Sequence, residues 1–418
     1  MQKLLINGKQ VLGGSISISG AKNAAVAILP AAILAGEKVA ISNMPSITDT
    51  NLLLEILKAL GAKVQKEGKN IVKIDPAGVN STSPPFEMVK KMRASYYFMG
   101  SLVARFGRAE IPLPGGCNLG PRPIDQHLKG FSALGAEINQ EHGTVTVKGK
   151  KLKGAHIYLD VVSVGATINI MLAATTAEGR TIIENAAKEP EIVDTANFLN
   201  ALGAKIRGAG TDVIKIDGVK ELGGAEHCII PDRIEAGTFM FAAAATRGEL
   251  TICDIIPKHL DPVIAKLREI GIQVDVGEES LHVCGQDSLS PVDIKTFPYP
   301  GFPTDLQPLA MVLLSTIPGT SLIKENVFDG RFKHVDELKR MGAKIKVEGR
   351  TAVIEGVEGF TGAPVKATDL RAGAALLVAG LIAEGETRLS GVEHIRRGYE
   401  NIEKKFAQAG VELKCVER

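Results

Sequence analysis

The 418-residue sequence contains no tryptophan, and aromatic residues make up only 4% of it. Its cysteines lie far apart, without CxxC or His-rich spacing, at Cys117, Cys228, Cys253, Cys284 and Cys415. This spacing is typical of neither a disulfide framework nor a metal site, so we expect a reducing cytoplasm and no metal. Basic and acidic residues nearly cancel, 49 against 47, and no Lys/Arg block stands out. That balance argues against nucleic acid as a partner.

Long apolar runs and phosphate-binding loops are also missing. No apolar run is long enough to span a membrane, and the first residues lack the apolar core of a signal peptide. The sequence has no GxxxxGK[ST] loop and no GxGxxG after a predicted strand, which argues against nucleotide hydrolysis and dinucleotide redox chemistry. The remaining composition, 45% hydrophobic and 23% charged, is that of a globular protein with two or three domains.

One phrase recurs six times along the chain. In each copy an amphipathic helix ends at a glycine and an alternating strand begins, as in residues 57–64 and 199–206. The glycines are 68 to 74 residues apart, at Gly61, Gly135, Gly203, Gly271, Gly342 and Gly410. A repeat of this regularity determines the fold more strongly than any single motif.

A second, Ala-rich helical signal precedes each copy, and a short β-prone segment usually follows it. These helices are apolar on most sides, which is typical of a helix buried all round. They span residues 22–34, 92–106, 164–177, 234–246, 306–316 and 371–383. Three such units around a common centre would place the helices inside and the sheets outside. Six units therefore predict an α/β fold of two barrel-like domains, each of three βαβαββ-type repeats.

The repeats divide the chain near residue 228. Repeats one to three form a domain of residues 22–228, and repeats four to six follow from residue 229. The first predicted strand, residues 3–19, precedes the repeats and could join either half. Loops near Gly20 and Cys228 would then form a double-stranded hinge, and such domains commonly close on a substrate in the cleft between them.

The second repeat contains an unusual loop at residues 115–125, with the sequence GGCNLGPRPID. Glycine and proline at this density predict a shaped loop, a kind of segment that often carries function. From Gly107 to Gly135 this repeat spans 28 residues, whereas the corresponding spans elsewhere are 23 to 25. The extra residues fall in the loop, which makes Cys117 a candidate functional thiol. An ordinary surface turn is the alternative.

Charged residues stand at the starts of the predicted buried helices. They are Lys22 with Asn23, Arg93, Arg233 with Glu235, Asp305, and Asp369 with Arg371. Cations are disfavoured at a helix start unless an anion binds there. Capping and ordinary salt bridges are the alternative reading, above all for Asp369 and Glu235. Arg331 and Arg397 lie in turns that correspond to the Cys117 loop, so the pattern favours a polyanionic substrate.

The chain resembles the UDP-N-acetylglucosamine 1-carboxyvinyltransferases, the enolpyruvyl transferases that begin bacterial peptidoglycan synthesis. The resemblance runs along the whole chain and is carried by residues 19–24, 113–125, 162–167, 302–307 and 368–373. It implies two inside-out α/β domains joined by a double-stranded hinge, with residues 1–21 completing the second domain. It also implies an active site in the interdomain cleft.

The resemblance further implies transfer of the enolpyruvyl group of phosphoenolpyruvate to the 3-hydroxyl of UDP-N-acetylglucosamine, with release of phosphate and without a cofactor. This addition and elimination needs an acid, a base and cations. By resemblance Cys117 is the acid and Asp305 the base. Phosphoenolpyruvate would be held by Lys22, Arg122 and Arg397, with Arg93, Arg331 and Arg371 completing the cationic site. The UDP-sugar would be held by Asn23, Arg122, Pro123, Ile124, Asp125, Ser163, Val164, Gly165, Asp305 and Val327, with Phe328 and Asp369 nearby.

Two departures from the family pattern accompany the resemblance. Many relatives carry Trp where this chain has Tyr97, and some carry Asp at the position of Cys117. A thiol beside Arg122 should be strongly nucleophilic, so we expect the epoxide antibiotic fosfomycin to alkylate Cys117.

Three other readings stay open at this point. The sister transferase acting on shikimate 3-phosphate shares the fold but lacks the Cys117 loop. A non-catalytic repeat scaffold would explain the six repeats but not the cations. A nucleotide-sugar sensor would bind the sugar nucleotide without turnover. Separately, the sequence does not indicate an oligomeric state.

Overall fold

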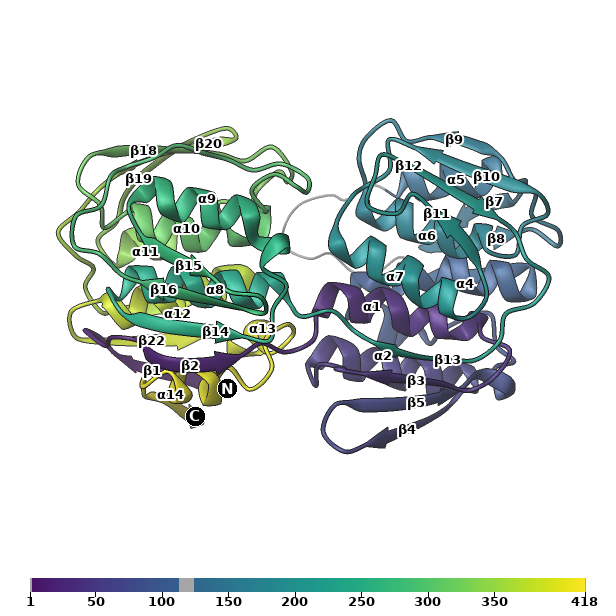
Figure 1. Ribbon diagram of the computed structural model, residues 1–418, viewed down its shortest axis with the longest axis horizontal. Coiled ribbons are helices and arrows are strands. Elements are labelled where there is room, and N and C mark those ends of the chain that lie inside the picture. The colour runs from purple at the N-terminus through teal and green to yellow at the C-terminus, as the bar shows by residue number, and fades with distance from the viewer. Residues whose placement is uncertain (1, 113–123, 418) are drawn as a thin grey trace. The chain divides into compact units, whose positions relative to one another are not determined.

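The computed structural model describes residues 2–112 and 124–417 (Figure 1). These residues form two compact units. The amino-terminal unit runs from Gly20 to Ile230, and the carboxy-terminal unit combines the residues up to Ser19 with those from Pro231 onward. The sequence pattern places these boundaries at residues 21/22 and 228/229. Residues 113–123, with most of the predicted loop, lie outside the described part of the chain.

Three sheets enclose the amino-terminal unit as far as it is described. Their strand orders are β13(Ala225–Cys228)-β3(Val39–Ser42)-β5(Ile71–Asp75)-β4(Lys63–Glu67), β6(Arg108–Pro112)-β8(Thr144–Lys148)-β7(Glu137–Glu141) and β11(Lys205–Arg207)-β12(Val213–Asp217)-β10(Arg180–Glu184)-β9(His156–Tyr158). Its helices are α1(Lys22–Ala31), α2(Thr48–Leu60), α3(Phe86–Val89), α4(Tyr97–Phe106), α5(Asp125–Ala133), α6(Val164–Ala174) and α7(Pro190–Ala201), with 3-10 turns η1(Ala32–Leu34), η2(Pro76–Gly78) and η3(Arg93–Tyr96).

The described carboxy-terminal unit repeats this plan. Its sheets are β15(Gln273–Val276)-β16(Ser280–Cys284)-β14(Glu249–Cys253)-β2(Gly13–Ser17), β17(Ile294–Lys295)-β18(Thr320–Lys324)-β20(Thr351–Glu355)-β19(Lys344–Glu348) and β21(Pro364–Lys366)-β22(Glu386–Ser390)-β1(Gln2–Asn7)-β23(Leu413–Glu417). Its helices are α8(Arg233–Ala245), α9(Asp261–Ile270), α10(Gln307–Leu314), α11(Val335–Arg340), α12(Leu370–Ile382), α13(Val392–Ile395) and α14(Ile402–Gln408), with 3-10 turns η4(Pro257–Leu260) and η5(Thr304–Leu306). Figure 1 shows the helices of this unit lying among its sheets.

The predicted inner helices are α1, α4, α6, α8, α10 and α12, and most residues of each are buried. In the amino-terminal unit α4 packs on both α1 and α6, and in the other unit α10 packs on α8 and α12. Small residues allow the close approach: a Cβ on Gly100 of α4 would lie 2.4 Å from the carbonyl oxygen of Asn169 of α6. The prediction of Ala-rich helices inside a shell of sheets is therefore confirmed.

The repeated glycines adopt the backbone conformation that the sequence pattern predicts. All six have φ between 80° and 111°, in the region where glycine avoids the clash of a side chain. Each follows an outer helix and precedes an edge strand, as Gly61 does between α2 and β4. The same glycine conformation therefore forms the helix-to-strand turn in all six repeats.

The predicted strand at residues 3–19 is in fact two strands in two different sheets. β1 pairs antiparallel with β22 and β23, whereas β2 pairs parallel with β14. The chain bends between them, where Lys9 has φ 56° and where a Cβ on Gly8 would lie 1.7 Å from the carbonyl oxygen of Ala383. The amino-terminal segment therefore completes two sheets of the carboxy-terminal unit.

A buried ion pair secures the end of this segment. Lys405 Nζ lies 2.7 Å from Glu235 Oε1 and 2.7 Å from Ser19 Oγ, and the Ser19 amide donates to Glu235 Oε2 at 2.8 Å. Burial raises the pKa of Glu235, while Lys405 opposes that shift. The cap of α8 is Asp232, which accepts from two backbone amides. Glu235 therefore forms a salt bridge, which is one of the alternative roles that the sequence left open for it.

Candidate active site

The start of α1 carries two of the predicted site residues in the amino-terminal unit. Lys22 Nζ lies 3.0 Å from Asp49 Oδ2, and both side chains are mostly buried. Asn23 Nδ2 donates to Glu191 Oε1 at 3.4 Å. Asp49 belongs to α2 and Glu191 to α7. Lys22 is therefore already balanced by a carboxylate, which the sequence pattern did not predict, and α1 is tied to two neighbouring helices.

Arg93 lies in η3, one turn before α4 begins. Its guanidinium carbon lies 5.9 Å from the centre of the Tyr96 ring. Tyr97 is the first residue of α4. Burial raises its pKa, and Glu191 and Glu189 raise it further. The Tyr97 hydroxyl is therefore neutral near pH 7.

A buried polar network lies between α4, α5 and α6. Asn169 Nδ2 donates to the Tyr96 carbonyl at 2.8 Å and lies 2.9 Å from His127 Nδ1, while Asn169 Oδ1 accepts from the Gly100 amide at 2.8 Å. Because the Asn169 amide nitrogen can only donate, the network assigns the acceptor role to His127 Nδ1 and the proton to Nε2. A Cβ on Gly165 would lie 3.0 Å from this ring, so glycine there allows the close packing.

The neutral state of His127 predicts sensitivity of the fold to acid. Burial lowers its pKa to about 4 from an ordinary value of 6.5, and Arg93 adds to the shift. The unfolded chain therefore takes up the proton first. The stability that His127 contributes should be complete above pH 6.5 and lost as the pH falls through 4, by up to about 3 kcal/mol.

Urea unfolding at pH 7 and pH 5 tests this expectation. His127→Gln should lose less stability between the two pH values than the parent protein does. His142→Gln serves as the surface control, because that side chain is exposed in the turn between β7 and β8. An unchanged pH dependence in His127→Gln would contradict the assignment.

The remaining described site residues predicted in the amino-terminal unit lie at the starts of α5 and α6. Ser163 caps α6, its Oγ accepting from the Ala166 amide at 3.3 Å, and Val164 and Gly165 form the first turn. Ile124 and Asp125 begin α5. Gln126 joins the start of α5 to the segment between β9 and α6, because its amide nitrogen contacts both Asp125 Oδ2 at 2.9 Å and Asp160 Oδ2 at 3.1 Å. Free backbone amides at the start of α6 suit an anionic ligand.

In the carboxy-terminal unit, one carboxylate lies between two buried guanidinium groups. Asp305 Oδ1 is 3.1 Å from Arg331 Nη2, and Asp305 Oδ2 is 3.1 Å from both Nε and Nη2 of Arg371. The arginine side chains are only 2% and 4% exposed, whereas Asp305 is 25% exposed. Arg331 Nε and Arg371 Nη1 are buried without a hydrogen-bond partner. The Asp232 carboxylate also acts on Arg371, so the cluster is not a pair of cations with a single anion. Its buried N–H groups without partners are the feature that an anionic ligand would satisfy.

Neighbouring groups keep Arg371 charged. Burial works against its charged form, but the Asp305 carboxylate and Tyr399 raise the pKa above its ordinary value overall. The Tyr399 ring centre lies 5.4 Å from the guanidinium carbon. Asp369 caps α12 by accepting from the amides of Arg371 and Ala372 at 2.9 and 3.1 Å. Asp369 therefore caps a helix, which is one of the alternative roles that the sequence left open for it.

Two further predicted segments belong to the same unit. Val327 and Phe328 follow β18, and the Phe328 ring centre lies 5.9 Å from the Arg331 guanidinium carbon. Arg397 lies in the turn after α13, two residues before Tyr399. The predicted residues Cys117, Arg122 and Pro123 lie outside the described residues. The predicted site residues that are described therefore fall into two groups, one in each unit, and each group is called a candidate half-site below.

Sequence reasoning did not find several residues that hold these half-sites. Asp49 and Glu191 orient Lys22 and Asn23, and His127 and Asn169 support the start of α6. Glu325 binds the segment that carries Val327 and Phe328. Their positions in the sequence carry no motif, although Asp49 and Glu191 lie in the first turns of α2 and α7.

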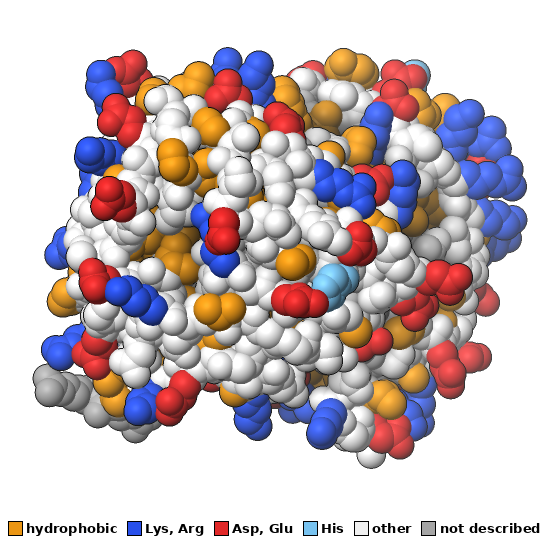
Figure 2. Space-filling view, turned by 60° about the vertical axis from the view of Figure 1, so that its left-hand side comes forward, with side chains coloured by type: hydrophobic (Ala, Val, Ile, Leu, Met, Phe, Trp, Pro, Cys, Tyr) orange, Lys and Arg blue, Asp and Glu red, His pale blue; other side chains and the backbone are white. Residues whose placement is uncertain are grey.

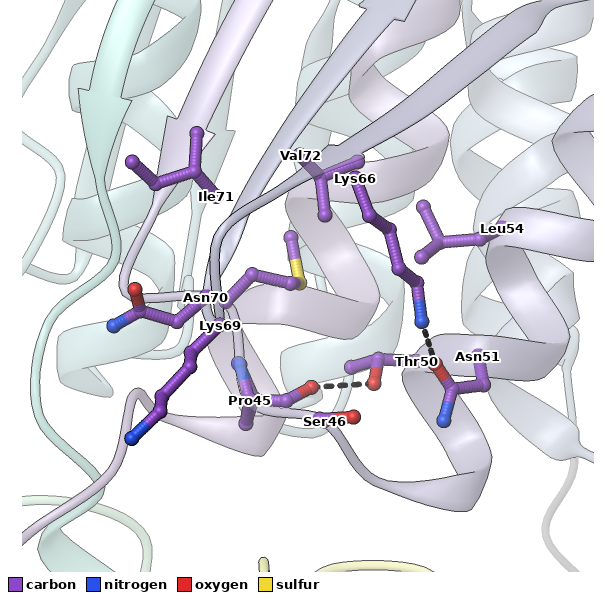
Figure 3. Close-up of a pocket in the computed structure, with 11 residues that line it drawn as sticks. Pro45, Ser46, Thr50, Asn51, Leu54, Lys66, Lys69, Asn70, Ile71 and Val72 are labelled. Atoms are coloured by element: carbon purple, nitrogen blue, oxygen red, sulfur yellow. Dashed lines mark hydrogen bonds between the residues drawn. The ribbon is translucent and has the colours of Figure 1, made fainter.

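Two hollows on the described surface contain none of the predicted site residues. Figure 3 shows one lined by the turn before α2 and by the β4–β5 hairpin, where Lys66 Nζ bonds Asn51 at 2.7 Å and the Thr50 hydroxyl donates to the Pro45 carbonyl at 2.6 Å. Another, of about 350 Å³, is lined partly by Arg105. Side chains of both charge signs are interspersed over the face in Figure 2.

The described residues give two further results about ligands and membranes. No helix among them has the length and apolar character needed to cross a membrane. They contain no group of three or more His, Cys, Asp or Glu residues placed to hold a metal ion.

Comparison with known proteins identifies the family. The family model described as EPSP synthase (3-phosphoshikimate 1-carboxyvinyltransferase) matches residues 6–406. The chain belongs to the EPSP synthase family of carboxyvinyltransferases. It is therefore a transferase, and the fold predicted from its repeats is the fold of this family.

Curated relatives of this carboxyvinyltransferase match it along its full length. UDP-N-acetylglucosamine 1-carboxyvinyltransferase 3 of Caldanaerobacter subterraneus is 57% identical over 99% of both chains. UDP-N-acetylglucosamine 1-carboxyvinyltransferase 2 of Bacillus subtilis is 56% identical over 99% of this chain and 96% of the relative. These matches confirm the resemblance drawn from the sequence motifs.

Solved structures agree with this assignment. The enolpyruvyl transferase NikO from Streptomyces tendae has a TM-score of 0.91 at 26% identity, covering 99% of both chains. EPSP synthase from Acinetobacter baumannii has a TM-score of 0.77 at 20% identity over the full length of both chains, and it supports the fold alone.

Proposed function

We propose that this carboxyvinyltransferase moves the enolpyruvyl group of phosphoenolpyruvate onto the 3-hydroxyl of UDP-N-acetylglucosamine and releases phosphate. This reaction is the first committed step of bacterial peptidoglycan synthesis. The full-length relatives named for UDP-N-acetylglucosamine, at 54–57% identity, favour this acceptor over shikimate 3-phosphate. The scattered cysteines favour a cytoplasmic location for the enzyme.

The structural observation that carries the proposal is the Asp305 cluster. A carboxylate between two buried guanidiniums leaves polar N–H groups without partners, and these groups would bind an anionic substrate. Phosphoenolpyruvate supplies a carboxylate and a phosphate, so Lys22, Arg122 and Arg397 would share its charge with this cluster. The proposal requires both half-sites to act on the same pair of substrates.

In the reaction, the sugar oxygen forms a bond to C2 of phosphoenolpyruvate while a proton is added to C3. The C2–O bond to phosphate then breaks, and C3 loses a proton to restore the double bond. Cys117 would supply the proton to C3, and Asp305, which is partly exposed, would accept the proton of the sugar hydroxyl. The paired arginines would stabilise the negative charge on the leaving phosphate.

The other predicted residues would hold the sugar nucleotide. Ser163, Val164 and Gly165 offer backbone amides at the start of α6. Asn23, Arg93, Arg122, Pro123, Ile124, Asp125, Val327, Phe328 and Asp369 complete the proposed binding set.

Phosphate release from phosphoenolpyruvate tests the proposal. Without added metal, we expect release that requires UDP-N-acetylglucosamine and stops after treatment with fosfomycin. Shikimate 3-phosphate in its place should give no release. Release with shikimate 3-phosphate alone would favour the sister reaction, and binding of the UDP-sugar without release would favour a sensor.

A further inference from the structure

A fully buried carboxylate lies beside the carboxy-terminal half-site. Glu325 directly follows β18 and is 0% exposed. Its Oε1 accepts from Thr296 Oγ1 at 2.8 Å and from the amides of Val327 and Phe328 at 2.8 and 3.1 Å. Its Oε2 accepts from Thr304 Oγ1 at 2.9 Å. Four donors from three segments of the chain therefore converge on one carboxylate.

The donor groups are themselves fixed in direction. Thr296 Oγ1 accepts from the Asn326 amide at 2.9 Å, so its proton is free to point at Glu325. The Glu325 amide donates to the Arg350 carbonyl at 2.8 Å, and this bond holds the same segment from its other side. A buried carboxylate stabilised by neutral hydroxyl and amide donors loses much of its solvation, and the donors offset that cost only while they keep this geometry.

The two oxygens of Glu325 hold two different parts of the half-site. Oε2 fixes Thr304, the residue directly before Asp305. Oε1 fixes the amides of Val327 and Phe328, and the Phe328 ring lies beside Arg331. A carboxylate needed only to fill the core would not have to take its donors from both predicted substrate-binding segments.

We infer that Glu325 is a positioning residue, which sets the Asp305 segment and the Val327–Phe328 segment in register for the sugar-nucleotide acceptor. The inference rests on the proposed function. Glu325 does not touch the reacting atoms, because its oxygens are occupied and its side chain is closed to solvent. It acts through the segments that it holds.

Steady-state kinetics with both substrates test the inference. Glu325→Ala leaves four donors without their acceptor, so the KM for UDP-N-acetylglucosamine should rise about tenfold to a hundredfold. The KM for phosphoenolpyruvate should change less, and kcat should fall. Glu325→Gln should restore most of the activity, because its carbonyl oxygen can accept from the two amides while its amide nitrogen donates to the Thr304 hydroxyl.

Two milder variants test separately the hydrogen bonds that Thr304 and Thr296 make to Glu325. Thr304→Val removes the bond beside Asp305, so kcat should fall more than the KM for the sugar nucleotide rises. Thr296→Val removes the bonds to Glu325 and Asn326, so that KM should rise more than kcat falls. Thr387→Val is the control, because Thr387 is fully buried in the same unit, as Thr296 is, and its hydroxyl has no partner. Both constants should be unchanged in it.

The parent protein is measured first, so that two kinds of failure can be told apart. A parent protein without acceptor-dependent phosphate release overturns the proposed function and this inference with it. An active parent whose Glu325 and threonine variants keep both constants overturns the inference alone. If Glu325→Ala does not fold, the Gln and threonine variants decide. Equal changes in the two threonine variants, without the kcat–KM split, would also contradict it.

Discussion

Cys117→Ser should abolish most turnover and leave binding of the UDP-sugar nearly unchanged. Serine keeps the size of the side chain, but its hydroxyl is a far weaker acid than a thiol with an ordinary pKa near 8.5. Loss of a general acid lowers kcat by about 10²–10⁴-fold. We expect this fall in phosphate release, together with an unchanged dissociation constant for UDP-N-acetylglucosamine in calorimetry.

Two further variants control this experiment. Cys228→Ser changes an exposed free thiol in the amino-terminal unit and should leave kcat unchanged. Cys117→Asp should recover activity, because some family members carry Asp at this position, and it should resist fosfomycin. Full activity of Cys117→Ser would refute the assignment of Cys117 as the acid.

Asp305→Asn should lower both turnover and stability. The substitution removes the carboxylate charge that contacts both the Arg331 and Arg371 guanidiniums, and these groups are almost fully buried. Breaking a buried ion pair by removing one partner costs about 3–5 kcal/mol. We expect a loss of that order in the free energy of unfolding and a fall in kcat of about a hundredfold or more.

The expected loss of stability distinguishes a broken ion pair from the loss of a catalytic base alone. Asp329→Asn is the matched control in the same unit, since its carboxylate pairs with Arg350 while 68% exposed and should contribute little. Urea unfolding and phosphate release would be measured on both variants. Parent-like stability in Asp305→Asn would contradict the charge balance, and parent-like turnover would contradict the role of Asp305 as base.

Much of the fold could be predicted from local sequence signals. Each repeated glycine, such as Gly61 or Gly271, marks a helix end with positive φ, and each Ala-rich run marks an inner helix. Local patterning could not show that residues 3–19 form two strands. That result depends on Ala383, which approaches Gly8 from a distant part of the chain.

The site was predicted less completely, because its interactions join residues that are far apart in the sequence. The sequence predicted that the cations Lys22 and Arg371 would bind an anion at a helix start. In the fold Lys22 already contacts Asp49, and Arg371 contacts Asp305, 66 residues away. Glu325 carries no motif, so only the convergence of its four donors reveals it.

The most direct test of the account follows the carbon atoms of the transferred group. Phosphoenolpyruvate labelled with ¹³C at all its carbons would be incubated with UDP-N-acetylglucosamine and the enzyme, and the products identified by mass spectrometry. We expect one sugar nucleotide that carries the labelled three-carbon enolpyruvyl group, with phosphate released in equal amount. Labelled pyruvate beside unmodified sugar nucleotide, or no turnover at all, would contradict the proposed transfer.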